Sequence, residues 1–418
     1  MTRRPWIVFS TAVLMTGVGA PAVAAGQDTL RVSPATGRAG IGDAVRRAKA
    51  GSVILVGSGV YREPTIVLDR SVQLIGEGNP VLDGEGKREL ILVTADDVTV
   101  RGLVLRNTGS SYVQDRAALK AMDVSGCVIQ GNRVEDAYFG LYLGRVTDCR
   151  ISDNVLLSRA GNESAAGNGI HLWTTSGIEI SGNDVRGHRD GIYLEFTRNA
   201  RVHGNTSTGN LRYGLHFMYS DDCEYTNNTF SANLAGVAVM YSQKVTMTGN
   251  RFADSWGGAS YGLLLKEIYD PVIVGNVFSR NTVGIVADGA VRIQALENTF
   301  ERNGWAVRLL ASTYDGRFEK NNFVGNTFDV TTNSFTVQNH FHRNYFDSYR
   351  AYDLDRDGFG DVPHRPVRLF AVLVERSPQA ILLLRSFLVG VLDIAERMIP
   401  AATPSSLADA SPAMRRWP

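Results

Sequence analysis

Hydrophobic and polar residues alternate along most of the chain in short runs that end at glycine or asparagine. Runs such as residues 178–180, 184–185 and 192–194 have the two-residue period of a β-strand and are too short for a pair of helices. In each unit an asparagine stands just before a hydrophobic residue, mostly 22 or 23 residues after the previous one. These asparagines are Asn132, Asn154, Asn183, Asn205, Asn228, Asn250, Asn276, Asn298, Asn322 and Asn344.

A second marker, a glycine followed by three mostly hydrophobic residues, runs in phase with the asparagines. The glycines are Gly140, Gly169, Gly191, Gly214, Gly236, Gly262 and Gly284. Two markers locked together over so many units indicate a solenoid. Coils stacked about 4.8 Å apart form parallel sheets around an apolar core, and a recurrent asparagine suits a turn in which amides bond from coil to coil. The sequence therefore predicts an all-β, right-handed parallel β-helix with three sheets and about 22 residues per coil.

The boundaries of the β-helix follow from the same patterns. Residues 25–52 predict an N-terminal strand and an amphipathic helix over 41–50 that caps the open core, and residues 53–347 predict the coils. The longer gaps between asparagines predict loop insertions at 158–168 and 254–261.

Residues 1–24 predict a signal peptide. Arg3 and Arg4 form its positive start, an apolar stretch follows, and Ala22-Val23-Ala24 gives a small-residue cleavage pattern. General secretion fits better than twin-arginine export because Pro5 follows the arginine pair. An uncleaved anchor is the weaker alternative, because the apolar run is shorter than the ~20 residues that a membrane span needs. The sequence therefore predicts an exported protein.

The repeat register predicts which way each reactive side chain points. All three cysteines, Cys127, Cys149 and Cys223, occupy the same inward position, five residues before an asparagine. Buried small side chains are the simplest interpretation, and a disulfide between Cys127 and Cys149 on neighbouring coils is the alternative in an oxidising compartment.

The glycine-marked strand carries the most informative outward positions. If Leu215 and Phe217 point inward, His216 and Met218 point outward and exposed, and His171 and Met240 share that face. Imidazole and thioether groups suit Cu(I), so these four residues are candidate copper ligands. An aromatic-rich surface for protein contact is the alternative.

After the repeat, residues 348–366 form an acidic loop. Asp353, Asp355 and Asp357 alternate before a glycine and Asp361 follows, as in the first half of a calcium-binding loop. His364 stands where such a loop has its bidentate glutamate. A calcium site and a merely structured acidic turn both remain open.

Residues 367–400 predict helices with an apolar stretch at 380–392 that is unsuited to a solvated tail. Charged residues at its edges argue against a simple membrane span. It either caps the last coil or docks on a membrane partner or the membrane interface. The Ala/Ser/Pro-rich residues 401–418 predict a disordered tail.

Three segments resemble the NosD family of periplasmic β-helix proteins in nitrous oxide reductase maturation. They are residues 214–222 (GLHFMYSDD), residues 236–242 (GVAVMYS) and the acidic loop running into residues 362–366 (VPHRP). The resemblance extends over nearly the whole mature chain, and the two Met-Tyr-Ser segments with the loop are its most specific parts.

The resemblance implies a periplasmic protein that is not an enzyme. It implies work with a NosF-like ABC ATPase and a NosY-like membrane subunit, copper received from a NosL-like chaperone, and support of copper-site assembly in nitrous oxide reductase. The apolar stretch 380–392 would then dock on the membrane subunit, and His216, Met218 and Met240 become the leading copper candidates.

Two other classes of function remain as alternatives. Parallel β-helices often cleave or epimerise acidic polysaccharides, and Glu195, Asp221, Asp222 and Lys266 could line a groove for that chemistry. However, the Asp-Pro-His-Asp signature of alginate epimerases is absent. A structural spacer or adhesin leaves the apolar stretch unexplained. Nucleic acid is not an expected partner, because 43 Lys and Arg residues are balanced by 42 Asp and Glu residues.

Overall fold

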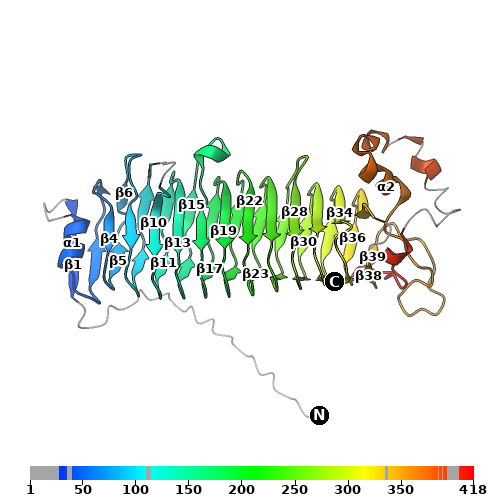
Figure 1. Ribbon diagram of the computed structural model, residues 1–418, viewed down its shortest axis with the longest axis horizontal. Coiled ribbons are helices and arrows are strands. Elements are labelled where there is room, and N and C mark those ends of the chain that lie inside the picture. Colours follow the sequence, from blue (N-terminus) through cyan, green and yellow to red (C-terminus); the bar gives the residue numbers. More distant parts are fainter. Residues whose placement is uncertain are drawn as a thin grey trace, which may run out of the picture.

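The computed structural model describes residues 28–34, 40–109, 114–334, 338–384, 386–387, 389–392 and 404–418. Short strands wind into a long stack of coils that runs from the N-terminal to the C-terminal end of the molecule (Figure 1). Every strand pairs in parallel with the equivalent strand of the next coil, which confirms the three-sheet parallel solenoid. The predicted signal peptide, residues 1–24, lies outside the described residues.

Sheet A contains the strand that precedes most coils' asparagine, and it has 14 strands among the described residues. They are β1 (Thr29–Val32), β2 (Val53–Val56), β5 (Gln73–Gly76), β8 (Thr99–Arg101), β11 (Val128–Gln130), β14 (Arg150–Ser152), β17 (Glu179–Ser181), β20 (Arg201–His203), β23 (Glu224–Thr226), β26 (Thr246–Thr248), β29 (Val272–Val274), β32 (Gln294–Leu296), β35 (Gly316–Glu319) and β38 (Asn339–His342).

Sheet B follows the asparagine turn, with 13 strands in the described part of the chain. They are β3 (Val60–Tyr61), β6 (Val81–Asp83), β9 (Val104–Arg106), β12 (Arg133–Glu135), β15 (Val155–Leu157), β18 (Asp184–Arg186), β21 (Thr206–Thr208), β24 (Thr229–Ser231), β27 (Arg251–Ala253), β30 (Val277–Ser279), β33 (Thr299–Glu301), β36 (Asn322–Val324) and β39 (Tyr345–Phe346).

Sheet C contains the glycine-marked strands, which are the longest of the three sheets and number 12 where the chain is described. They are β4 (Ile66–Leu68), β7 (Ile91–Val93), β10 (Ala117–Met122), β13 (Phe139–Gly144), β16 (Ile170–Trp173), β19 (Asp190–Glu195), β22 (Tyr213–Met218), β25 (Ala235–Met240), β28 (Tyr261–Lys266), β31 (Val283–Asp288), β34 (Trp305–Leu309) and β37 (Phe328–Thr332).

The recurrent asparagines form one buried column, as the spacing predicts. In each step the backbone N–H and the side-chain Nδ2 of one asparagine donate to Oδ1 of the next; for Asn132 and Asn154 the distances are 2.9 and 3.1 Å. The column passes through Asn321, not the predicted Asn322, which begins β36. Because residues 321 and 322 are both asparagines, the sequence alone does not show which of them occupies the column at this coil.

A second asparagine column, between sheets B and C, is not part of the sequence prediction. Asn210 and Asn233 are joined by the same pair of bonds, and Asn281, Asn303 and Asn326 continue the pattern. Buried amides that satisfy one another coil by coil fix the register of the stack.

The core is apolar along its whole length and is strengthened by stacked rings. Phe252 and Phe278 lie with ring centroids 4.6 Å apart and planes 3° from parallel, and the stack continues on the later coils of sheet B. Ring stacking at each step adds to the area that the coils bury.

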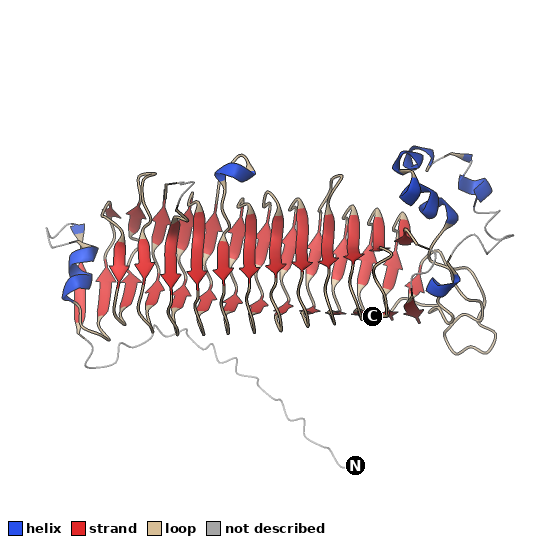
Figure 2. Ribbon diagram, viewed as in Figure 1, coloured by secondary structure: helices blue, strands red, loops and turns tan. Residues whose placement is uncertain are grey.

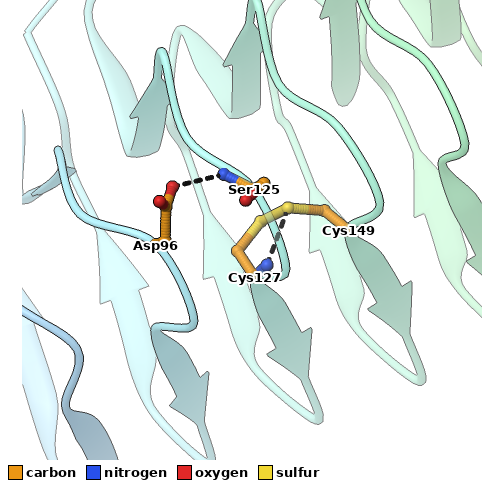
Figure 3. The surroundings of a disulfide bond; sticks show 4 residues. All are labelled: Asp96, Ser125, Cys127 and Cys149. Carbon is orange, nitrogen blue, oxygen red and sulfur yellow. Dashed lines mark hydrogen bonds between the residues drawn. A yellow bond between two sulfur atoms is a disulfide. The ribbon is translucent and has the colours of Figure 1, made fainter.

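A disulfide joins two early coils inside this core. Cys127 and Cys149 are bonded, with Cα atoms 4.6 Å apart, beside the contact between the Ser125 N–H and Asp96 (Figure 3). The inward position of the cysteines is confirmed, and for this pair the disulfide alternative holds. Cys223 is free and buried, and burial raises the pKa of its thiol to about 12. The thiol is therefore protonated at neutral pH in the protein without a bound metal.

Short helices lie at both ends of the stack (Figure 2). At the N-terminal end, α1 (Ile41–Arg47) buries Ile41, Ala44 and Val45 on the first coils, as the amphipathic pattern predicts. The η2 helix (Glu163–Ala165) lies in the predicted 158–168 insertion. At the C-terminal end, α2 (Leu369–Arg376) and η3 (Pro378–Leu383) follow the acidic loop.

The prediction of a disordered tail is wrong for residues 404–418. This segment, with η5 (Ser405–Leu407), returns along the last coil, where Leu407 and Asp409 are fully buried. The Asp409 carboxylate accepts hydrogen bonds from the backbone N–H and Nδ2 of Asn344, both at 2.9 Å. It therefore takes the place that the next asparagine of the first column would occupy. Composition alone gave no sign of this contact.

No helix among the described residues is long and apolar enough to cross a membrane.

Candidate functional site

The outer face of sheet C holds the predicted copper candidates in the predicted register. His216 is aligned with Tyr193 on β19 and Ala238 on β25, while Met218 is aligned with Glu195 and Met240. His171 lies in the same column as His216, with Tyr193 between them. Leu215 and Phe217 are buried in the core, so the outward direction of His216 and Met218 follows from the strand period.

The prediction that His216 is exposed is wrong: the side chain points outward but is covered. Its residue exposure is 5%, and that of His171 is 9%. Neighbouring rings provide the cover, since Tyr193 lies between the two imidazoles with ring centroids 4.9 Å from His171 and 4.8 Å from His216. Tyr213 packs against His216 at 4.8 Å, and Tyr142 stacks on His171 at 4.7 Å.

A buried ion pair lies beside His216 and was missed by the sequence analysis. The Asp190 carboxylate is fully buried, and Arg212 donates to both of its oxygens, from Nε to Oδ1 at 2.8 Å and from Nη2 to Oδ2. Nδ1 of His216 lies 3.5 Å from Oδ2 of Asp190. Burial acts to raise the pKa of Asp190, but the contacts with Arg212 and His216 outweigh it and lower the pKa to about 2. The carboxylate is therefore charged at neutral pH.

The two imidazoles differ in their partners. Asn168 contacts Nδ1 of His171 through its Nδ2 at 3.0 Å, whereas both ring nitrogens of His216 are buried without a hydrogen-bond partner among the described residues. Burial, followed by the positive charge of Arg189, lowers the pKa of His171 to about 3, so this imidazole is neutral. Buried ring nitrogens without a hydrogen-bond partner are uncommon, and in the described part of the chain they occur at His216 and also at His188.

Met218 and Met240 lie side by side on neighbouring strands, and both are half-buried. The Tyr193 hydroxyl lies 3.8 Å from Sδ of Met218. Next to the methionines, Phe196, Tyr219 and Tyr241 form a stack of rings with centroids 5.3 and 5.1 Å apart, of which Phe196 and Tyr219 are exposed. The two thioethers thus lie at an accessible rim, while the imidazole lies behind it.

Three of the four copper candidates lie on two adjacent strands of sheet C, with the two methionines directly aligned. His216, Met218 and Met240 come from the adjacent strands β22 and β25, whereas His171 is separated from them by β19. An imidazole with two thioethers is a donor set suited to Cu(I) and unsuited to hard cations.

The residues of the polysaccharide alternative do not converge. Glu195 and Lys266 are separated across sheet C by Met218 and Met240. Asp221 accepts a hydrogen bond from the Gln243 N–H, and Asp222 lies 3.9 Å from Lys244. The carboxylates of Glu195, Asp221 and Asp222 therefore form no pair that is placed for acid–base chemistry.

The acidic loop places three carboxylates together. Ligand oxygens of Asp353, Asp355 and Asp357 lie within 4.8 Å of one another. Asp361 is not part of this cluster, and its Oδ2 accepts a hydrogen bond from the Leu354 N–H at 2.7 Å. His364 is half-buried and packs against Phe346 at a centroid distance of 4.3 Å. The loop thus offers three of the carboxylates that calcium needs and no glutamate at its twelfth position.

The same carboxylates also bond the loop's own backbone. Asp353 accepts the Gly358 N–H at 3.0 Å, and Asp357 accepts the Phe359 N–H at 2.8 Å. These bonds shape the loop without a cation, so the structured-turn alternative keeps its support beside the calcium site.

Sequence comparison places the chain among known proteins. Residues 157–352 match the model of a family described as periplasmic copper-binding protein (NosD). The chain is 32% identical over 371 residues to a protein of Pseudomonas aeruginosa named probable ABC transporter binding protein NosD, covering 84% of this chain and 85% of that one. A protein of the same name from Stutzerimonas stutzeri is 30% identical over 370 residues, covering 83% and 84%.

Solved structures with the same fold include polysaccharide enzymes of low sequence identity. The A-module of the Azotobacter vinelandii mannuronan C-5 epimerase AlgE6 superposes with a TM-score of 0.52 at 16% identity, covering 72% of this chain and 87% of the module. The Yersinia enterocolitica family 28 exopolygalacturonase gives 0.55 at 11% identity, covering 78% and 79%. These likenesses concern the fold alone, whereas the identity to the two curated relatives extends over most of each chain. The chain therefore belongs to the NosD family.

Proposed function

We propose that this protein is the periplasmic copper-handling component of an ABC-transporter-type complex that supports copper-site assembly in nitrous oxide reductase. Its role is to bind and pass on Cu(I), not to catalyse a reaction. Copper is cargo held at His216, Met218 and Met240, and His171 contributes to the ring stack that buries His216. A NosL-like chaperone is the proposed copper donor.

The observation that carries this proposal is the donor set at the rim of sheet C. Two half-buried thioethers are aligned on neighbouring strands, and the unpartnered Nε2 of His216 belongs to the same outward face. Thioethers stay neutral at every pH and bind Cu(I) without competition from protons. A site of two soft neutral donors and one imidazole suits transient binding, because fewer strong ligands leave the ion exchangeable.

The test is competition for Cu(I) with a chromophoric chelator under anaerobic conditions. The triple variant His216→Gln, Met218→Leu, Met240→Leu keeps side chains of similar volume, and we expect it to bind copper roughly 100-fold more weakly. Met122→Leu is a matched control, because Met122 lies in the same outward column of sheet C beside Gly144 instead of a second methionine. Equal affinity in the triple variant and the wild type would show that copper binds elsewhere.

The C-terminal extension is the proposed contact with a NosY-like membrane subunit, through which a NosF-like ATPase acts. One side of it packs on the last coils, where Phe370 contacts Phe328 and the Arg308 guanidinium pairs with Glu375. The other side leaves Leu382 and Phe387 exposed at 86% and 88%. Residues 404–418 then return to the last coil. The apolar surface formed by Leu382 and Phe387 thus lies between two segments that pack on the coils, α2 before it and residues 404–418 after it. Large apolar side chains this exposed indicate an interface.

Co-purification with the membrane subunit tests this contact. The double variant Leu382→Ser, Phe387→Ser should abolish the complex while leaving Cu(I) binding intact. Leu354→Ser is the control, because Leu354 is 77% exposed but lies on the acidic loop. If the double variant still co-purifies with the membrane subunit, the extension only covers the last coil and is not the docking surface.

A further inference from the structure

A polar cleft of about 590 Å³ opens near the N-terminal end of the stack. One of its walls is Lys120 on β10, which lies four strands before β22 in sheet C. The other side chains come from the segments that precede β4, β7 and β10, so three successive coils build the cleft. All of its lining residues are polar or charged. The cleft shares no residue with the copper candidates.

Hydrogen bonds between coils and within one coil hold the cleft in shape. Nη1 of Arg116 donates to the carbonyl oxygen of Lys87 at 2.9 Å, and Nζ of Lys120 donates to that of Asp115 at 2.9 Å. The Thr65 hydroxyl donates to the carbonyl oxygen of Glu89, also at 2.9 Å. Because these bonds exist before any ligand arrives, binding does not have to order the walls.

The cleft carries positive charge that its own carboxylates do not neutralise. Arg88 pairs with Glu85, and Nζ of Lys120 lies 3.7 Å from Glu89. Lys87 and Arg116 form no ion pair with any described residue, and Arg116 interacts with the Glu89 carboxylate only at longer range. Two cations without an ion-pair partner therefore lie beside the carboxylates of Glu89 and Asp115 and the amide of Gln114.

We propose that this cleft binds a carboxylated saccharide. Lys87 and Arg116 bind a sugar carboxylate through charge-assisted hydrogen bonds. Glu89, Asp115 and Gln114 accept hydrogen bonds from sugar hydroxyls. An acidic peptide fits less well, because it has no hydroxyl groups to donate to these acceptors and the cleft has no apolar side chain to hold its residues. The volume falls within the range of small-ligand sites. This inference is independent of the copper site.

The experiment is titration calorimetry of the full mature chain with trigalacturonate, at low ionic strength. We expect binding by the wild type, and a loss of roughly tenfold or more in affinity for Lys87→Gln and for Arg116→Gln. Lys87 is exposed on a loop, so its variant folds even if Arg116→Gln disturbs the wall. Arg201→Gln is the matched control, since Arg201 is exposed on β20 of sheet A.

Two further ligands decide the chemical class. Maltotriose has the hydroxyls without the carboxylates, and a short polyglutamate has the carboxylates without the hydroxyls; both should bind much more weakly than trigalacturonate. The proposal is overturned if trigalacturonate does not bind, if Lys87→Gln leaves its affinity unchanged, or if either comparison ligand binds as tightly. Cu(I) affinity, measured on the same variants, should not change, which separates this result from the fate of the copper proposal.

Discussion

The Asp190 carboxylate lies 3.5 Å from Nδ1 of His216 on the neighbouring strand, and the same carboxylate accepts hydrogen bonds from Nε and Nη2 of Arg212. The contact places Nδ1 of the imidazole beside the carboxylate, so Nε2 is the nitrogen that we propose for the metal. A carboxylate behind a ligating imidazole fixes its orientation and makes it a better donor. The ion pair is therefore part of the proposed copper site although neither residue touches the ion.

We expect Asp190→Asn to destabilise the fold by about 2–3 kcal/mol. The change leaves the partly buried Arg212 without its carboxylate, and the cost of breaking a buried pair is reduced here because Arg212 keeps some contact with water. Urea denaturation at pH 7 measures it. Asp222→Asn is the control, because the pair of Asp222 with Lys244 is exposed and should matter by less than about 0.5 kcal/mol.

The pH dependence of the same variant has a definite sign. The pKa of Asp190 falls from 3.8 to about 2 on folding, so the carboxylate stabilises the fold fully above pH 4. That stabilisation is lost as the pH falls toward 2. The wild type should therefore lose its advantage over Asp190→Asn between pH 4 and pH 2. A constant difference across this range would contradict the role given to the ion pair.

Copper affinity should respond to Asp190→Asn as well. Loss of the carboxylate behind the imidazole is expected to weaken Cu(I) binding about tenfold, because Nε2 becomes a poorer donor and the ring is less well fixed. Asp222→Asn should leave the affinity unchanged. If Asp190→Asn binds copper as the wild type does, His216 is not a ligand, even if the methionines are.

The strand period was sufficient to predict which side chains leave sheet C, but not which of them water reaches. Leu215 points inward and His216 outward because neighbouring residues of a strand alternate. The cover over His216 comes from Tyr193 and Tyr213 and from the Asp190–Arg212 pair, which belong to other coils. Coverage by neighbours depends on how side chains lean along the stack, and no single repeat contains that information.

The ends of the stack were the least predictable part. Residues 404–418 have the composition of a disordered segment, yet Asp409 bonds to the last asparagine of the column. A lone aspartate has no repeat to identify it, so the sequence could not reveal this contact. Four carboxylates were expected in the acidic loop, and three of them cluster, whereas the position of His364 depends on packing against Phe346.

Asp409 gives a direct test of the asparagine column. It accepts the N–H groups of Asn344 and Arg343 and Nδ2 of Asn344. Asp409→Ala leaves these buried donors unpaired and should cost about 2–4 kcal/mol, whereas Asp409→Asn keeps one acceptor and should cost less than half as much. Hydrogen exchange of the last coil is the measurement, with an early coil as internal control. Equal exchange in the two variants would mean that the tail only covers the coil and does not extend its bonding.

The acidic loop makes a separate prediction about calcium. If it binds the cation, three carboxylates without a bidentate glutamate should give a dissociation constant of roughly 0.1–1 mM. Trp417 lines the cleft beside Asp353 and Asp357, so it should sensitise the luminescence of bound Tb³⁺. Asp355→Asn should weaken the signal, and Trp417→Phe should remove it without changing affinity. No luminescence at millimolar Tb³⁺ would leave the loop as a hydrogen-bonded turn.

Asp329 should make the stability of the last coils, on which α2 packs, depend on pH. It is buried on β37, and burial raises its pKa to about 6 despite the nearby charge of Arg368. Because the unfolded carboxyl has a pKa of 3.8, the folded state holds the proton more tightly. Stability should therefore fall as the pH rises from 4 to 7, by about 2 kcal/mol.

Asp329→Asn keeps an acceptor for Nδ2 of Asn326 and removes this fall, so the variant should be more stable than the wild type at pH 7 but not at pH 4. Urea denaturation at both values measures this, with the exposed Asp315→Asn as control. A pH profile of stability that is unchanged in Asp329→Asn would show that the carboxyl is already hydrated or paired in the native protein, and that the attachment of α2 does not respond to its charge.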